Sequence, residues 1–271
     1  MKFLVNDVNY HVEVCGRGFP LVLLHGFTGD SSTWTHFCEQ LGKHSQLIIP
    51  DIIGHGKTDL PDDSQRYSIE AAAQDLSLIL DQLGIRQIDL LGYSMGGRLA
   101  LTFAVLFPER VRKLILESSS PGLLSVEERK QRRDKDAVLA HFIIKKGMEQ
   151  FVDYWEEIPL FASMKQLPQA ARERVRKQRL ANSPKGLANS LLYMGTGSQP
   201  SWWERLETLK CEVLLITGEK DQKFCGIAEK MITRLKKAIW VSVPNTGHAI
   251  HVEDCEKFVT IVSDFLSIEK K

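Results

Sequence analysis

Two hydrophobic patterns succeed one another along this chain of 271 residues. Residues 1–14 alternate between apolar and polar side chains around a turn at Asn6-Asp7, which predicts a β-hairpin. Short continuous apolar runs then occur at residues 21–26, 47–51, 88–94, 111–118, 211–219 and 238–244. Continuous runs are typical of strands that are covered on both faces, as in a parallel sheet. Helical spacing between the runs, as in residues 69–83 and 98–107, predicts an α/β fold with helices on both faces of a mostly parallel sheet.

The middle of the chain breaks this alternation. Residues 121–201 contain no strand-like run, and helical spacing dominates them. From residue 122 to residue 200 there are 14 Lys and Arg against 9 Asp and Glu, or +5, which leaves −4 for the rest of a chain whose net charge is +1. We expect residues 121–201 to be a helical cap inserted into a core of residues 1–120 and 202–271. Such a cap would cover the sheet edge where α/β folds bind ligands.

Composition narrows the class of protein. With 43% hydrophobic and 25% charged residues and a net charge of +1, the chain is typical of a globular protein and has no general attraction to nucleic acid or membranes. No apolar stretch has transmembrane length. The cysteines at 15, 38, 211, 225 and 255 are odd in number and scattered. We therefore expect no disulfide framework, no zinc site and a reducing, cytoplasmic environment.

The sequence Gly92-Tyr93-Ser94-Met95-Gly96 lies between an apolar run and a helical pattern. This context is typical of a nucleophile elbow, in which two glycines permit a tight turn that exposes a serine hydroxyl. The alternative is a glycine-rich turn that only packs a strand against a helix. The context favours a functional Ser94.

A serine hydroxyl needs a base, and the base needs an acid to orient it. Asp221 follows one core strand and His248 follows the next, so both would lie on the same sheet edge as Ser94. Glu219 is the alternative acid. For the oxyanion hole we expect the backbone N–H groups of Met95 and Phe27, chosen by position alone.

Two further histidines, His25 and His55, lie in loops near these residues. They could belong to the chemistry, but we interpret both as structural, bonded to loop backbone.

The whole chain resembles the α/β-hydrolase superfamily, and it is most similar to the 2-succinyl-6-hydroxy-2,4-cyclohexadiene-1-carboxylate (SHCHC) synthases of menaquinone biosynthesis. The stretches that carry the resemblance are HGFTGD, GYSMGGRLAL, LESSSPGL, EERKQRRDKD, YWEEIPLFAS, RKQRLANS, TGEKDQKF and TGHAIHVE. The resemblance implies a carbon–oxygen lyase that eliminates pyruvate from a small, tri-anionic substrate, with Ser94 acting as a base. It implies no cofactor and no metal. We expect a monomer or a weak homodimer.

The resemblance also implies substrate-binding residues, by matching positions. They are Tyr93, Arg98, Arg132, Trp155 and Arg179. Neighbouring arginines leave the register of the second and last arginines open: Arg129 and Arg133 compete with Arg132, and Arg176 competes with Arg179. The structural alternatives are an ion pair between Arg98 and Glu117, cap arginines on a solvated face, and Trp155 as a core aromatic.

Two other functions remain open from the sequence. One is a carboxylesterase or carbon–carbon bond hydrolase in which Ser94 is a covalent nucleophile. The other is a member of the fold that binds a ligand without catalysis.

Overall fold

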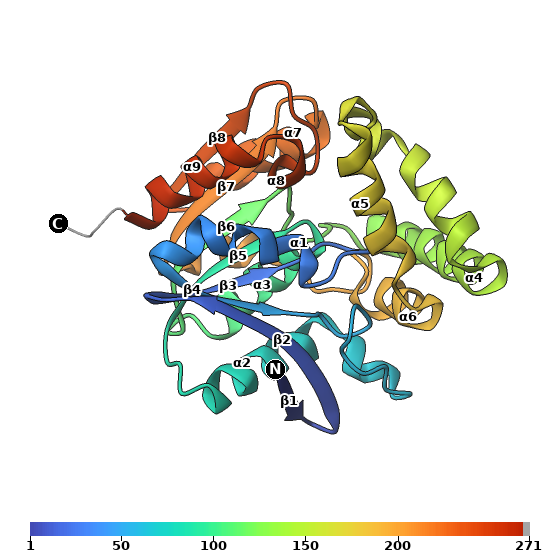
Figure 1. The fold of residues 1–271 in the computed structure, drawn as a ribbon, viewed down its shortest axis with the longest axis horizontal. Coiled ribbons are helices and arrows are strands. Elements are labelled where there is room, and N and C mark those ends of the chain that lie inside the picture. Colours follow the sequence, from blue (N-terminus) through green and yellow to red (C-terminus); the bar gives the residue numbers. More distant parts are fainter. Residues whose placement is uncertain (268–271) are drawn as a thin grey trace.

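The computed structural model describes residues 1–267, and over this range one sheet is formed in the order β1-β2-β4-β3-β5-β6-β7-β8 (Figure 1). The pairs β1–β2 and β2–β4 are antiparallel, and every other neighbouring pair is parallel. The strands are β1 (Lys2–Val5), β2 (Val8–Gly16), β3 (Phe19–Leu24), β4 (Ser45–Pro50), β5 (Ile88–Tyr93), β6 (Val111–Glu117), β7 (Glu212–Gly218) and β8 (Ala238–Val243). The predicted α/β fold is confirmed.

Helices cover both faces of the sheet, because successive strand residues point to opposite sides and both sets are apolar. Val22 and Leu24 of β3 belong to the cluster on one face, whereas Leu21 and Leu23 belong to the cluster on the other. The first face is covered by α2 (Ile69–Gln82), α3 (Met95–Leu106) and α7 (Gln222–Ile232). The second is covered by α1 (Ser32–Thr35), η1 (His36–Glu39), η2 (Leu41–Lys43) and α9 (Cys255–Ser267).

The chain between β6 and β7 is helical up to residue 194, and the described residues there add no strand to the sheet. We call α4 (Val126–Glu157), η4 (Pro159–Gln166), α5 (Gln169–Leu180) and α6 (Pro184–Met194) the inserted helices. Figure 1 shows them, in green to yellow, gathered on one side of the sheet. They have a small apolar cluster of their own that includes Ile143, Phe151 and Leu187.

The remaining short helices are η3 (Ser64–Tyr67), η5 (Trp203–Thr208) and α8 (Ile250–Glu253). Of the helices within residues 1–267, none combines the length and the apolar character that a membrane span requires, α4 included.

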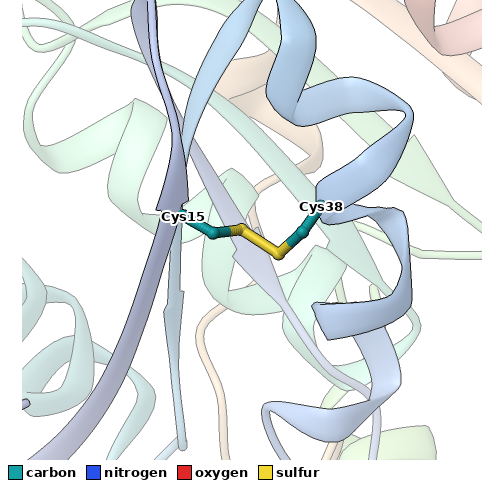
Figure 2. The surroundings of a disulfide bond; sticks show 2 residues. All are labelled: Cys15 and Cys38. Carbon is teal, nitrogen blue, oxygen red and sulfur yellow. A yellow bond between two sulfur atoms is a disulfide. The ribbon is translucent and has the colours of Figure 1, made fainter.

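The structure contradicts the expectation that the cysteines form no disulfide framework in a reducing compartment, because one pair is bonded. Cys15 at the end of β2 and Cys38 in η1 form a disulfide, with 6.0 Å between their Cα atoms (Figure 2). They lie 23 residues apart in the chain, and their proximity arises from the packing of η1 and η2 against β2. Sequence spacing carries no signal of this packing, and an odd number of cysteines does not prevent one pair from forming. The argument for a reducing compartment therefore loses its basis.

Candidate active site

Ser94 lies in the sharp turn between β5 and α3. Its backbone has φ 50° and ψ −105°, a region that residues with a side chain rarely adopt. A Cβ atom on Gly92 would lie 2.3 Å from the carbonyl oxygen of Gly96, and one on Gly96 would lie 2.3 Å from that of Leu24. Glycine is thus required on both sides of Ser94, which explains the spacing of the motif.

Ser94, His248 and Asp221 form a hydrogen-bonded series. His248 Nε2 lies 3.0 Å from Ser94 Oγ, and His248 Nδ1 lies 2.6 Å from Asp221 Oδ2. The carboxylate accepts the Nδ1 proton, so Nε2 is left to accept the serine proton. His248 and Asp221 are both buried, which protects this arrangement from water.

Asp221 is held by its position at the start of α7, where its other carboxylate oxygen accepts the N–H of Phe224. The competing acid, Glu219, instead accepts the N–H of Asn245, on the turn that follows β8. The geometry therefore favours Asp221 as the partner of His248.

The two backbone groups predicted for an oxyanion hole border the same space as Ser94. Phe27 and Met95 both line the cavity that contains Ser94 and His248. Met95 is the first residue of α3, where the helix leaves its N–H groups without partners. Over residues 1–267, the N–H groups of both residues donate to no acceptor.

His25 and His55 bond to backbone, which confirms their structural interpretation. His25 Nδ1 donates to the Gly26 carbonyl, and its Nε2 accepts the N–H of Ile52. His55 Nδ1 donates to the Ile53 carbonyl. Burial lowers the pKa of His25, and it lowers that of His55 to about 3, so both rings are neutral near pH 7.

A cavity of about 550 Å³ opens over Ser94, between the sheet edge and the inserted helices. Its wall contains most of the residues that the sequence singled out: Phe27, Tyr93, Ser94, Met95, Arg98, Arg132, Trp155 and His248. Asp221 lies behind His248. The cavity is large enough for a small organic substrate.

Arg98 lies one turn after Ser94 on α3 and has no carboxylate partner. One of its terminal nitrogens donates to the Met194 carbonyl at 2.7 Å and to the side-chain oxygen of Gln199. The alternative ion pair with Glu117 does not form, because Glu117 accepts hydrogen bonds from the ring and backbone of His251. Burial, followed by the positive charge of Arg132, lowers the pKa of Arg98 to about 9.

Arg132 is the arginine of its stretch that lines the cavity. Its Nε donates to both oxygens of Asp136, at 2.8 and 3.0 Å. Burial raises the pKa of Asp136, and the charges of Arg132 and Arg98 act against this shift. The competing Arg133 donates to the Gly197 carbonyl instead.

Arg179 does not border the cavity that contains Ser94. It lines a neighbouring cavity of about 380 Å³, and Phe27, Tyr93 and Phe161 border both spaces. Its guanidinium lies over the ring of Phe161, 4.7 Å from the centroid, and 3.5 Å from Glu156. Its competitor Arg176 forms ion pairs with Asp153 and Glu156.

The aromatic residues of the wall are packed around His248 and Phe27. The Tyr93 ring lies 5.4 Å from that of His248, and burial raises the pKa of Tyr93 well above its usual value. The Trp155 ring packs against Phe27 and Phe161. Its indole N–H is buried and has no partner within residues 1–267, so it is free to donate to a ligand.

The sequence reasoning missed three residues of this region. Lys223 and Phe224 line the cavity, and Gln199 holds Arg98. The two residues on α7 immediately follow Asp221 and Gln222, so their position in the chain was a usable signal. Gln199 had no signal, because its role depends on where the chain returns from the inserted helices.

Comparison with known proteins identifies the family. The model of the alpha/beta hydrolase fold family matches residues 20–254. The chain belongs to the α/β-hydrolase fold family, and it is an enzyme of that superfamily. Within the family it is 49% identical, over 91% of this chain and 90% of the other, to a Bacillus subtilis protein named as a 2-succinyl-6-hydroxy-2,4-cyclohexadiene-1-carboxylate synthase.

Two further family members are similar over most of their length. A protein of the same enzyme name from Photorhabdus laumondii is 32% identical, over 93% of this chain and 86% of the other. The structure of MenH from S. aureus superposes with a TM-score of 0.90 at 37% identity, over 95% of this chain and 97% of that one. These similarities support the resemblance that the sequence motifs indicated.

Proposed function

We propose that this protein is an SHCHC synthase, a lyase that eliminates pyruvate from 2-succinyl-5-enolpyruvyl-6-hydroxy-3-cyclohexene-1-carboxylate in menaquinone biosynthesis. One observation carries the proposal beyond the family: a guanidinium without a carboxylate partner, that of Arg98, borders the cavity of a Ser–His–Asp arrangement. A half-buried cation without an anion is costly, and an anionic substrate would remove that cost. The names of the relatives agree with such a substrate.

The reaction begins with removal of the proton α to the succinyl ketone. Ser94 takes this proton as it passes its own to His248 Nε2, and Asp221 stabilises the imidazolium that forms. The Phe27 and Met95 N–H groups hold the developing enolate oxygen. The electrons of the C–H bond at C2 then form the C2=C3 double bond, the ring double bond shifts from C3=C4 to C4=C5, and the ether C–O bond at C5 breaks with its electron pair on oxygen.

The substrate has three carboxylates, and the arginines divide between two spaces. Arg98 and Arg132 border the reaction cavity, whereas Arg179 borders the neighbouring one beyond Tyr93 and Phe161. A guanidinium can bind a carboxylate with two parallel hydrogen bonds. In this assignment the reacting centre lies over Ser94, Tyr93 packs against the ring of the substrate, and Trp155 donates its free N–H.

Residues 121–201 act as a cap over a core of residues 1–120 and 202–271, and the two together enclose the substrate. We propose a cytoplasmic enzyme, on the ground of its biosynthetic role and not of its cysteines, that acts on a small anionic molecule without a cofactor, a metal, nucleic acid or a membrane. A monomer or a weak homodimer suffices, because the residues assigned above all come from one chain.

Pyruvate release from the enolpyruvyl substrate tests this function, with Ser94→Ala as the inactive control. Arg98→Ala should lower kcat/KM by roughly 2–4 kcal/mol of transition-state binding, and Arg98→Lys should recover little of it. The melting temperature should fall only modestly, because the substitution leaves the Met194 carbonyl and the Gln199 side-chain oxygen without this donor but leaves no carboxylate unpaired. A large fall in melting temperature with near-normal kcat/KM would overturn the role of Arg98.

The test also separates the lyase from the hydrolase alternative. A serine acting as a base forms no covalent intermediate, so the mass of the protein should be unchanged during turnover. Burst kinetics with a p-nitrophenyl ester and a trapped acyl adduct on Ser94, without pyruvate release, would instead establish the esterase function.

A further inference from the structure

Lys223 is a further cation of the reaction cavity to which no carboxylate of residues 1–267 is bonded. It lies in the first turn of α7, two residues after Asp221, and lines the same space as Ser94 and His248. Its ammonium group lies 5.2 Å from the centroid of the Phe224 ring, which in turn packs 4.7 Å from the ring of His248. Over residues 1–267 it makes no hydrogen bond and no ion pair.

The charges around Lys223 leave it without an anion. Asp221 is the nearest acid in the chain, but its carboxylate binds His248 and the N–H of Phe224. Burial, followed by the positive charge of Arg132, lowers the pKa of Lys223, and the attraction of Asp221 only partly offsets this. Arg132 is itself paired with Asp136, whereas no carboxylate in residues 1–267 binds Lys223, so the charge of Lys223 is available to an anion.

The two acids in the cavity wall, Glu128 and Glu229, form no ion pair with Lys223 within residues 1–267. Glu128 accepts the N–H of Ser125 in the capping box that begins α4. Glu229 and Lys230 are both exposed on α7 and both line the cavity, so together they add no net charge to it. The wall thus has four cations (Arg98, Arg132, Lys223 and Lys230) against two acids (Glu128 and Glu229), and with Arg132 paired to Asp136 it keeps a net positive charge.

We propose that Lys223 binds the carboxylate of the enolpyruvyl group, the part of the substrate that leaves, whereas Arg98 binds a carboxylate of the part that stays. This assignment rests on the proposed function. Hydrogen bonds to Met194 and Gln199 hold the guanidinium of Arg98 in place, so it can keep the retained part of the substrate in a fixed position. Part of the Lys223 side chain is exposed although the rest is covered, so the fragment it holds lies near solvent and can depart.

The chemistry explains why a cation is useful there. When the ether C–O bond breaks, its electron pair stays on the oxygen of the departing fragment. That fragment is enolpyruvate, which takes up one proton and becomes pyruvate. Negative charge thus develops beside a carboxylate that is already present, and a nearby ammonium group stabilises both charges in the transition state.

The experiment compares Lys223→Ala and Lys223→Arg with Lys220→Ala. Lys220 is a matched control, since it lies on the same strand-end loop but contacts Gln166 outside this cavity. Pyruvate release gives kcat/KM, and inhibition by added pyruvate reports the affinity for the product. We expect Lys223→Ala to lose about 10- to 100-fold in kcat/KM and to bind pyruvate more weakly. Lys223→Arg should recover part of both, and Lys220→Ala should match the wild type.

The outcomes distinguish a failure of the role of Lys223 from a failure of the proposed function. A wild-type protein that releases pyruvate, with unchanged kcat/KM and pyruvate inhibition in Lys223→Ala, overturns the role of Lys223 alone. Equal losses in Lys220→Ala and Lys223→Ala also overturn it, because they indicate a general charge effect. A wild-type protein that releases no pyruvate overturns the proposed function, and the assignment of Lys223 to the leaving group falls with it.

Discussion

The guanidinium of Arg98 donates a hydrogen bond to the side-chain oxygen of Gln199, a residue 101 positions later in the chain. The bond joins α3, which follows the motif of Ser94, to the segment that returns from the inserted helices. The same arginine also donates to the Met194 carbonyl at the end of α6. These neutral acceptors fix the position of Arg98. Asp136 acts on it only through its charge and forms no hydrogen bond with it, so the guanidinium remains available to a ligand.

Replacing Gln199 by glutamate should therefore separate activity from stability. In Gln199→Glu the new carboxylate pairs with Arg98 and competes with the substrate, so kcat/KM should fall about 10- to 100-fold. The melting temperature should change less than the activity, because the ion pair offsets the cost of burying the new carboxylate and of losing the amide donor to Pro200. Steady-state kinetics and thermal melting measure the two effects.

Two other variants serve as controls for this substitution. Gln40→Glu places the same charge on an exposed position away from the cavity, and it should leave kcat/KM unchanged. Gln199→Ala removes one acceptor without adding charge, so it should cost less activity than Gln199→Glu. Wild-type kinetics in Gln199→Glu would contradict the view that Arg98 must stay free of a protein anion.

Ser94 and His248 should act as a unit. Each of Ser94→Ala and His248→Ala breaks the same proton transfer, so each should lose most of kcat. The double variant should lose little more than either single one. Single-turnover measurements of pyruvate release give the three rate constants, and additive losses would mean that the two residues act independently.

The sequence predicts those features of the molecule that depend on neighbours in the chain. The apolar runs predicted the strands of the sheet because a strand covered on both faces has to be apolar throughout. The serine motif predicted its turn because a Cβ at Gly92 or Gly96 would overlap backbone. Asp221 and His248 could be placed since each follows a core strand on the same sheet edge.

Other features depend on packing between distant segments, and these the sequence did not reveal. Cys15 and Cys38 are brought together by the way η1 lies on β2. Matching to the family assigned Arg179 to the substrate, but only the packing of α5 reveals that Phe161 and Tyr93 lie between it and Ser94. Local pattern predicts elements and motifs, whereas the partners of a charged side chain follow from the tertiary structure.

The disulfide should stabilise the fold measurably. A cross-link between residues 23 apart lowers the entropy of the unfolded chain and so raises its free energy by about 3 kcal/mol. The double variant Cys15→Ser/Cys38→Ser should therefore lose about that much free energy of unfolding. A reducing agent should lower the stability of the wild type by a similar amount and leave the double variant unaffected. Cys255→Ser, at a free cysteine, should remain sensitive to the reducing agent. Urea unfolding with and without reductant measures these differences, and a wild type that does not respond would contradict the bond.

His55 should make the fold sensitive to acid. Burial, followed by the charge of His25, lowers its pKa from 6.5 to about 3, and its Nε2 is buried without a partner. Between these two pH values His55 is therefore protonated in the unfolded chain but neutral in the folded chain. Stability is fully present above pH 6.5 and falls as the pH drops toward about 3. Between pH 7 and pH 5 the loss from this residue alone should be about 2 kcal/mol.

Urea unfolding of His55→Gln at the two pH values isolates this contribution. A glutamine does not titrate, so the variant should lose less stability than the wild type between pH 7 and pH 5, even if it is less stable at pH 7. His44→Gln, at an exposed histidine, should show the same loss as the wild type. If His55→Gln lost as much as the wild type, the acid sensitivity would have to come from other groups. Protonation of the His55 ring would then not lower the free energy of unfolding.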